Sequence, residues 1–233
     1  IIYLITQILM NNSIYSNKHN NFLDKIVVKK RHEMSEIINN NIANLSIIHA
    51  LDIGTTDDEN FESSNFLIKN LKNIKIYKSI SDQNIKSNFF SNKLNKSITD
   101  NFTNEEIDIF SSDLVISNAT LEHVGDKNSQ IKMIENVIKL SKKIFVITTP
   151  NRFYPIDFHT KIPLIHWLPK SIHRKILKFL GLEYFSKIEN LNLMSEKDIK
   201  GILFNFKNIK YKIFYIKLAF IKSNFVIVGE IVD

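Results

Sequence analysis

The sequence predicts an α/β protein built around a doubly wound, mostly parallel sheet. Three observations predict this class. Apolar strand-like runs alternate with segments of helical periodicity from residue 47 to residue 149, as in sheets covered by helices. The run at 144–149 is almost wholly apolar, and the run at 112–118 is apolar without a break through Leu114, Val115 and Ile116, which is typical of parallel strands buried on both faces. The last two runs, 209–221 and 224–232, are separated by a short Lys-Ser turn and are expected to be antiparallel neighbours.

Each element is predicted from its own pattern of apolar residues. Short apolar runs predict strands at 47–53, 73–80, 112–118, 144–149, 209–221 and 224–232, with a further short strand near Ser97–Thr99. Apolar residues that recur every three or four positions predict helices at 32–45, 62–71, 129–143 and 196–206. The segment 83–111 is polar and gives no other clear signal.

Length and composition predict a single domain with two additions. The chain has 233 residues, of which 44% are hydrophobic, enough to bury a core. We expect an N-terminal helical segment over 1–45, and an inserted helical segment over 150–195, which holds all four prolines and the only tryptophan. The chain has no cysteine, which excludes disulfides, thiolate metal sites and a cysteine nucleophile. The absence of cysteine is compatible with a cytoplasmic protein.

The charge balance leaves two interpretations open. The net charge of +7 and a pI of about 9.3 are compatible with nucleic acid or an anionic membrane as a partner. The basic residues are scattered, without the long runs typical of binding tails, which favours a merely lysine-rich composition and makes a nucleic-acid partner unlikely. The first ten residues are apolar, but they are too few to span a bilayer. We expect them to pack on the domain or to be part of a truncated neighbouring segment.

Two stretches resemble a known family. "SDLVISNATLEHV" (112–124) is similar to the fourth-strand motif of the class I S-adenosylmethionine-dependent methyltransferases, and "TTPNRFYPIDFHTKIPLIHWLP" (148–169) resembles a bacterial branch similar to the type 11 methyltransferases. The resemblance covers about residues 45–232. It implies a seven-stranded Rossmann-like sheet with an antiparallel last strand, and S-adenosylmethionine as cofactor.

The resemblance also implies where the cofactor binds. In "LDIGTTDDEN", Asp52 and Gly54 match the family's first loop, and Thr55 stands where a smaller residue is usual. A single glycine is fewer than most nucleotide loops carry. The resemblance extends the predicted cofactor site to Asp82 for the ribose, Asp100 for the adenine amino group, and Asn118 and Ala119 beneath the cofactor. A turn or cap is the alternative role for Asp82, and a solvated loop carboxylate is the alternative for Asp100.

A histidine follows the fourth-strand motif directly. His123 is the candidate catalytic base, because its ordinary pKa lies near the working pH. Alternatively, Glu122 and His123 only orient the loop, and the resemblance favours this interpretation. Many methyl transfers need little more than alignment of the acceptor with an activated leaving group.

The insertion is the expected acceptor site. Its candidate substrate-binding residues are Asn151, Arg152, His159 and His166. Three histidines fall seven residues apart, but prolines break any helix that would align them, and an isolated Asp-x-His is a weak signal. We therefore predict no metal site. The apolar residues around Trp167 form either a lid or a membrane contact.

The predicted function is methyl transfer to a small-molecule, sugar or lipid-linked acceptor, in the cytoplasm or peripherally at the inner membrane. Three alternatives stay open. One is a fold that has lost the cofactor and serves as a binding or scaffold protein. Another is an RNA methyltransferase, suggested by the charge. The last is a nicotinamide-dependent oxidoreductase, which the missing G-x-G-x-x-G motif argues against. The sequence does not predict an oligomeric state.

Overall fold

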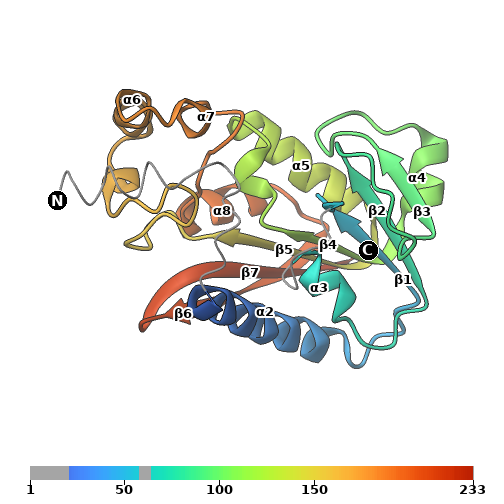
Figure 1. Cartoon of the computed structure of the whole chain (residues 1–233). Helices are drawn as coiled ribbons and strands as arrows, with labels where there is room; N and C mark the ends of the chain where they lie inside the picture. Colours follow the sequence, from blue (N-terminus) through green and yellow to red (C-terminus); the bar gives the residue numbers. More distant parts are fainter. Residues whose placement is uncertain (1–20, 58–63, 233) are drawn as a thin grey trace.

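The computed structural model describes residues 21–57 and 64–232. These residues form one seven-stranded sheet with helices packed against it (Figure 1). The strands are β1 (His49–Ile53), β2 (Ile76–Ser81), β3 (Asn92–Asn95), β4 (Ser112–Asn118), β5 (Ser141–Pro150), β6 (Ile209–Leu218) and β7 (Ile221–Ile231). The helices are α2 (Asn21–Ile42), α3 (Phe66–Lys69), α4 (Asn104–Phe110), α5 (Lys127–Leu140), α6 (Lys170–Phe179), α7 (Glu183–Ser186) and α8 (Glu196–Leu203), with short 3-10 turns η1 (Leu121–His123) and η2 (Ile165–Trp167).

The strand order confirms the predicted fold class. The sheet runs β3-β2-β1-β4-β5-β7-β6, with parallel pairing from β3 to β5. The last strand, β7, runs antiparallel to both of its neighbours, β5 and β6. The strand order reverses between β1 and β4, so the chain leaves these neighbouring strands in opposite directions across the sheet. A crevice for a ligand opens at the carboxyl ends of the strands at such a point.

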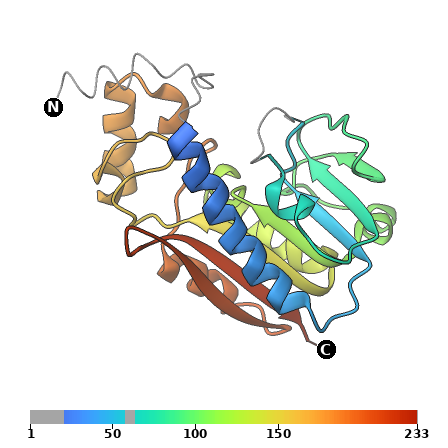
Figure 2. The ribbon, with the colours of Figure 1, turned by 60° about the horizontal axis from the view of Figure 1, so that its bottom comes forward.

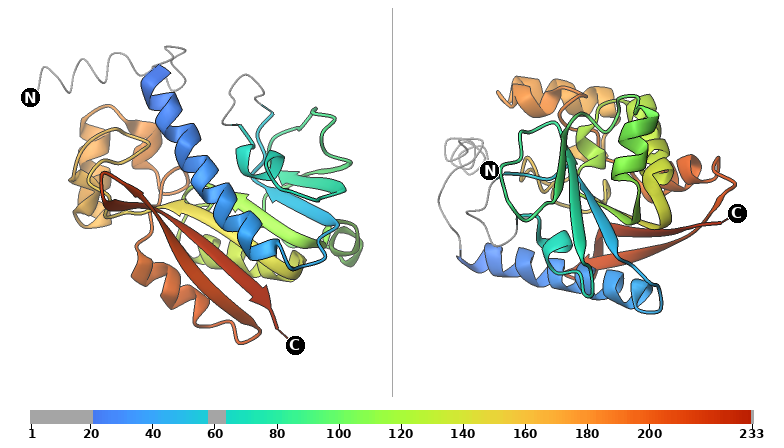
Figure 3. Two further views of the ribbon diagram at one scale, coloured as in Figure 1. Left: turned by 90° about the horizontal axis from the view of Figure 1, so that it is seen from below. Right: turned by 90° about the vertical axis from the view of Figure 1, so that its right-hand side faces the viewer.

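Helices cover both faces of the sheet (Figure 2). On one face Met34, Ile38 and Ile42 of α2 pack with α3 and with alternate residues of the strands. On the other face α5 and α8 pack against the remaining strand residues. Within β4, Leu114 belongs to the first core and Val115 to the second. This double burial explains why Leu114, Val115 and Ile116 form an unbroken apolar run in the middle of the strand. The right-hand view of Figure 3 shows α2 below the strands and α5 above them.

Several elements differ from the sequence prediction. Helix α2 begins at Asn21, well before residue 32. Helix α4 occupies part of the polar segment 83–111, and a capping box of Thr103 and Glu106 starts it. The third strand is Asn92–Asn95, not Ser97–Thr99, and it is a short polar edge strand without an apolar signal. The β6–β7 turn lies at Ala219 and Phe220, whose φ angles of 50° and 66° suit a two-residue hairpin turn, and not at the Lys-Ser pair.

The segment after β5 is a helical insertion, as predicted. Helices α6 and α7 lie together at one corner of the molecule, with η2 beside α6 (Figure 1). The expected packing of the first ten residues lies outside the described residues. Within the described ranges, no helix is both long and apolar enough to cross a bilayer.

Candidate functional site

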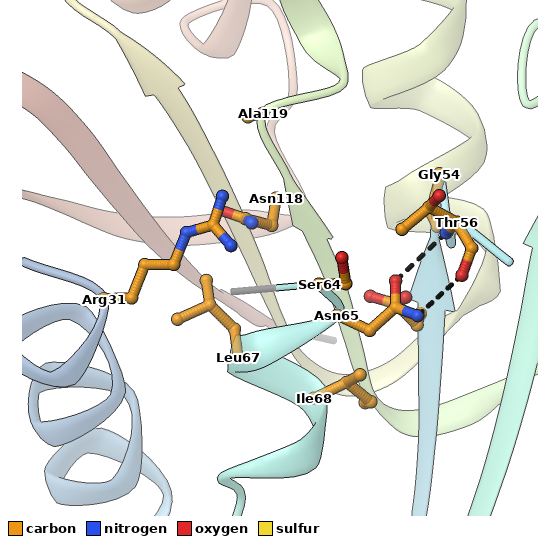
Figure 4. Close-up of a pocket in the computed structure, with 11 residues that line it drawn as sticks. Arg31, Gly54, Thr56, Ser64, Asn65, Leu67, Ile68, Asn118 and Ala119 are labelled. Carbon is orange, nitrogen blue, oxygen red and sulfur yellow. Dashed lines mark hydrogen bonds between the residues drawn. The ribbon is translucent and has the colours of Figure 1, made fainter. Parts of the chain in front are cut away.

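Three pockets open around the carboxyl ends of β1, β2 and β4. The β1 pocket is lined by Arg31, Asp52, Ile53, Gly54, Thr56, Ser64, Asn65, Leu67, Ile68, Asn118 and Ala119 (Figure 4). The β2 pocket continues from Gly54 and Ala119 to Asp82, Ser97, Ile98, His123 and His159, among others. The α2 pocket lies between α2 and the insertion, and its lining includes Val27, Arg31, Ala119, Glu122, Phe158 and His159. Ala119 lines all three pockets and therefore marks their junction.

The single glycine of the first loop has a clear steric reason. Gly54 has a φ of +81°, and a Cβ there would lie 2.2 Å from Thr120 Oγ1. Its N–H donates to the Ile80 carbonyl at 2.9 Å, which fixes the loop against β2. Only glycine combines this backbone conformation with so close a neighbour. The loop therefore needs glycine at this position, although the usual second and third glycines are missing.

A buried carboxyl group lies beneath the loop. Asp52 is 5% exposed, and the Thr55 hydroxyl donates to its Oδ2 at 2.7 Å. Ser81 in turn donates to the Thr55 carbonyl at 2.7 Å. Burial raises the pKa of Asp52 to about 7, although the hydrogen bond from Thr55 opposes this shift. The predicted residues Asp52, Gly54 and Thr55 thus form one connected loop structure.

The end of β4 supplies the junction of the pockets. Thr148 of β5 donates to Asn118 Oδ1 at 2.6 Å, which orients the amide toward the β1 and α2 pockets that it lines. Ala119 has a φ of +53°, a left-handed conformation that is uncommon outside glycine, and its N–H donates to the Thr148 carbonyl at 3.0 Å. Such backbone strain clusters at ligand sites. The structure therefore brings the predicted residues Asn118 and Ala119 together with Gly54.

Arg31 is a site residue that the sequence analysis missed. It extends from α2 into the β1 pocket, and Figure 4 shows its guanidinium group reaching toward Asn118. Burial lowers the pKa of Arg31 from its ordinary value, and no carboxylate of residues 25–57 or 64–232 lies within ion-pair distance of it. The helical spacing of Val27, Arg31 and Met34 was a signal that could have extended the predicted helix to this residue.

The two carboxylates predicted for the nucleoside lie in different places. Asp82 is exposed and lines the β2 pocket. Asp100 is exposed but lines none of the three pockets, and its backbone carbonyl accepts from Asn136 Nδ2 at 2.9 Å. The nearby residues Ser97 and Ile98 line the β2 pocket, whereas Asp100 does not. The chain therefore contacts the β2 pocket at Ser97 and Ile98, just before it reaches Asp100.

Glu122, His123 and His159 meet where the β2 and α2 pockets adjoin. The two histidine Nε2 atoms are 3.1 Å apart, and Glu122 Oε1 lies 4.0 Å from His123 Nε2 and 3.9 Å from His159 Nε2. Thr149 donates to Glu122 Oε2 at 2.9 Å. Asp157 Oδ1 lies 3.1 Å from His159 Nδ1. Burial alone would raise the pKa of Asp157, but the hydrogen bonds and charge of His159, with a hydrogen bond from Thr160, hold this pKa well below its usual range.

The other predicted substrate-binding residues hold the insertion in place. Asn151 donates to the Lys222 carbonyl at 2.9 Å. Arg152 donates to the carbonyls of His166 and Leu168 at 3.1 and 2.8 Å. His166 is buried, with its Nε2 2.7 Å from the Tyr154 carbonyl. Of the four predicted residues, only His159 lines the β2 or α2 pocket.

Comparison with known proteins rests on structure. No protein-family model and no curated protein matches the sequence. Magnesium protoporphyrin IX methyltransferase from Synechocystis PCC 6803, solved with bound S-adenosylhomocysteine, matches with a TM-score of 0.56 at 14% identity, over 93% of this chain and 90% of that one.

Two further solved methyltransferase structures match this chain over most of its length. The 1,6-didemethyltoxoflavin-N1-methyltransferase from Burkholderia thailandensis has a TM-score of 0.55 at 8% identity, over 100% of this chain and 88% of that one. The N-methyltransferase NodS from Bradyrhizobium japonicum WM9 has a TM-score of 0.52 at 11% identity, over 88% and 97%. Together with the strand order, these matches show that the chain has the fold of the class I S-adenosylmethionine-dependent methyltransferases.

Proposed function

We propose that the chain is an S-adenosylmethionine-dependent methyltransferase that acts on a small-molecule acceptor. The observation that carries the proposal is the meeting of the β1 and β2 pockets at Gly54 and Ala119, at the point where the strand order reverses. An elongated ligand with one charged end and one nucleoside end fits two pockets that join in this way. The fold is shared with methyltransferases that were solved with S-adenosylhomocysteine.

The charged groups favour one orientation of the cofactor. In the β1 pocket, the Arg31 guanidinium can pair with the amino-acid carboxylate and the Asp52 carboxylate with the ammonium group. In the β2 pocket, Asp82 can accept hydrogen bonds from the ribose hydroxyls, and the apolar Ile98 can pack on the adenine ring. Asp100 has no role in this proposal, because it lies outside the three pockets.

The acceptor then enters through the α2 pocket. Bound S-adenosylmethionine supplies a methyl group on a positively charged sulfur, a strongly activated leaving group. Ala119 offers only a methyl side chain at the junction, so an acceptor atom in the α2 pocket can approach the cofactor closely. The chain's main contribution is alignment. A role for His123 as a general base stays a prediction.

Calorimetric titration with S-adenosylhomocysteine tests the proposal. Two exposed aspartates form a matched pair, because Asp82 lines the β2 pocket and Asp100 does not. We expect Asp82→Asn to weaken binding about 10-fold or more, which corresponds to the loss of a hydrogen bond to a charged group, and Asp100→Asn to bind like wild type. A folded wild-type protein that binds no S-adenosylhomocysteine would contradict the proposal and favour the alternative of a binding or scaffold protein.

A lipid-linked acceptor is a second candidate, and one observation favours it. Leu164, Trp167, Leu168 and Ile172 are each between 39% and 49% exposed on the insertion. Exposed apolar side chains beside a basic helix are typical of membrane-surface contacts. Helix α6 supplies the basic residues, with Arg174, Lys175 and Lys178 in its sequence.

The fluorescence of Trp167 tests the second candidate, because it is the only tryptophan in the chain. With vesicles that contain anionic phospholipid, we expect a blue shift that Ile172→Ser weakens. Phe204→Ser is the matched control, since Phe204 is 84% exposed at the C-terminal end of α8, outside the insertion. An unchanged Trp167 spectrum in the presence of vesicles would overturn membrane contact and leave a freely diffusing acceptor.

A further inference from the structure

The cluster of Glu122, His123 and His159 holds more polar groups than its hydrogen bonds satisfy. Its three nearest ligand atoms all lie within 4.8 Å of one another. Glu122 is 0% exposed, yet its Oε1 has no hydrogen-bond partner among the residues that the structure describes. A buried carboxylate oxygen without a partner is costly, and it indicates a missing ligand.

The hydrogen bonds of the two imidazoles fix their tautomers. His123 Nδ1 lies 2.6 Å from the Asn190 carbonyl, which only accepts, so this nitrogen carries a hydrogen. His159 Nδ1 lies beside the Asp157 carboxylate at 3.1 Å and carries a hydrogen for the same reason. In the neutral rings both Nε2 atoms therefore present lone pairs, and these face each other at 3.1 Å. A cation must lie between them, either a proton or a metal ion.

The carboxylate distinguishes the two cations. A proton shared by the two Nε2 atoms would leave Glu122 Oε1 at 3.9 and 4.0 Å from them, beyond hydrogen-bond distance. One metal ion can contact all three atoms. Two ligand nitrogens about 2.1 Å from one ion lie about 3.0 Å apart at a right angle and about 3.4 Å apart at a tetrahedral angle. The observed 3.1 Å separation falls between these values.

The surroundings of the cluster also suit a metal ion. Histidine ligands of metals usually donate their other ring N–H to a carboxylate or a backbone carbonyl, and His159 and His123 do so to Asp157 and Asn190. Thr149 holds the second oxygen of Glu122 at 2.9 Å, which leaves Oε1 for the ion. Two histidines and one carboxylate with open positions suit Fe²⁺, Co²⁺ or Zn²⁺, whereas Mg²⁺ prefers oxygen ligands.

We propose that Glu122, His123 and His159 bind one divalent transition-metal ion. The open positions of the ion would face the junction of the β2 and α2 pockets, since His159 lines both. If the proposed methyl transfer holds, this places the ion where it can bind an oxygen atom of the acceptor, and the substrate class becomes one with a hydroxyl or carboxylate beside the methylated atom. His123 is then a metal ligand and not a free base.

Titration of the metal-free full chain with Co²⁺ and with Zn²⁺, without cofactor, tests the site directly. We expect one Co²⁺ per chain with visible absorption bands, and a higher unfolding temperature with either ion. His159→Gln and His123→Gln should weaken binding about 100-fold or more, and Asp157→Asn about 10- to 100-fold. His173→Gln is the matched control. His173 belongs to the series of histidines seven residues apart but lies outside the cluster, so this variant should bind both ions like wild type.

Glu122 is fully buried, so its substitution also perturbs folding, and the partly exposed His123 and His159 therefore carry the test. Absence of stoichiometric Co²⁺ and Zn²⁺ binding by the folded wild type, or equal binding by His159→Gln, would overturn the metal site. Calorimetry with S-adenosylhomocysteine on the same metal-free protein keeps the two proposals separate. Metal binding without cofactor binding would contradict only the methyltransferase proposal, and the reverse result would contradict only the metal site.

Discussion

The polar side chains at the ends of β1 and β4 and those of the insertion (residues 150–195) are used in different ways. Asp52 and Asn118 line pockets, and each is oriented by a single neighbouring hydroxyl. Arg152 and His166 instead satisfy backbone carbonyls within the insertion. Strands satisfy their backbone groups through the sheet, whereas an irregular segment needs side chains for that purpose. Polar side chains at the strand ends are thus available for ligands, whereas Arg152 and His166 hold the shape of the insertion.

The largest expected effect comes from the glycine of the first loop. In Gly54→Ala the added Cβ meets Thr120 Oγ1 at 2.2 Å, in a backbone conformation that disfavours alanine. We expect the loop to shift and S-adenosylhomocysteine binding to fall by about 100-fold or more. Calorimetry gives the affinity, and circular dichroism shows whether the variant is folded.

Gly201→Ala is the matched control, because a Cβ at this helical position meets nothing within 4 Å. It should bind like wild type. If Gly54→Ala is folded and binds as tightly as Gly201→Ala, the first loop does not contact the cofactor, and the distinction between the two regions fails.

Arg31 should have the next largest effect. Arg31→Gln removes the guanidinium that lines the β1 pocket, and we expect a loss of about 10- to 100-fold in S-adenosylhomocysteine affinity, as for a hydrogen bond to a charged group. Lys29→Gln controls for charge, since Lys29 is an exposed residue of the same helix. Equal affinities for the two variants, measured by calorimetry, would remove Arg31 from the site.

A substitution in the insertion should lower the stability of the fold and leave the affinity for S-adenosylhomocysteine unchanged. Arg152→Gln loses hydrogen bonds to two backbone carbonyls, so we expect the free energy of unfolding to fall by about 1–3 kcal/mol. The affinity for S-adenosylhomocysteine should not change. Urea unfolding and calorimetry measure the two quantities, with the exposed Lys178→Gln of α6 as control. A weaker affinity at full stability would place Arg152 in the binding site after all.

The two regions should also show opposite pH dependences of stability. Burial raises the pKa of Asp52 from 3.8 to about 7, so between these pH values the folded state holds a proton that the unfolded state has lost. The free energy of unfolding therefore falls as pH rises from about 4 to about 7. Burial lowers the pKa of His173 from 6.5 to about 4, so the free energy of unfolding falls as pH drops from about 6.5 to about 4. Asp52 lies at the end of strand β1, and His173 lies in the insertion.

Urea unfolding across pH 4–8 checks these signs without ligand. Relative to wild type, Asp52→Asn should gain stability as pH rises from about 4 to about 7, because it lacks the proton release. His173→Gln should gain relative stability as pH falls from about 6.5 to about 4. Parallel curves for wild type and either variant would show that the corresponding residue does not titrate in this way.

The sheet could be predicted from the sequence for a physical reason. Leu114 and Val115 face two different cores, so the middle of the strand is an unbroken apolar run that is easily recognised. Asn118 is the last residue of this strand and Ala119 follows it, and the sheet register then places them beside Gly54. A polar edge strand such as β3 has no such signal. Asp100 was assigned to the cofactor site from the family resemblance, whereas Ser97 and Ile98, which line the β2 pocket, carry no comparable signal.

Contacts between distant irregular segments could not be predicted. The seven-residue spacing suggested a group of His159, His166 and His173, whereas His159 turns toward His123 and His166 toward the Tyr154 carbonyl. No periodicity connects position 123 with position 159, because the loops around β5 and the insertion set their approach. The sequence analysis therefore considered a metal only within the insertion and predicted none.

A crystal structure of the chain with S-adenosylhomocysteine tests the central claim most directly. We expect the adenosine in the β2 pocket beside Asp82 and Ile98, and the amino-acid end in the β1 pocket beside Arg31 and Asp52. The sulfur atom should then lie near Ala119, at the junction with the α2 pocket. Crystals of the folded chain that hold the ligand elsewhere, or that show both pockets empty at saturating ligand concentration, would contradict the account.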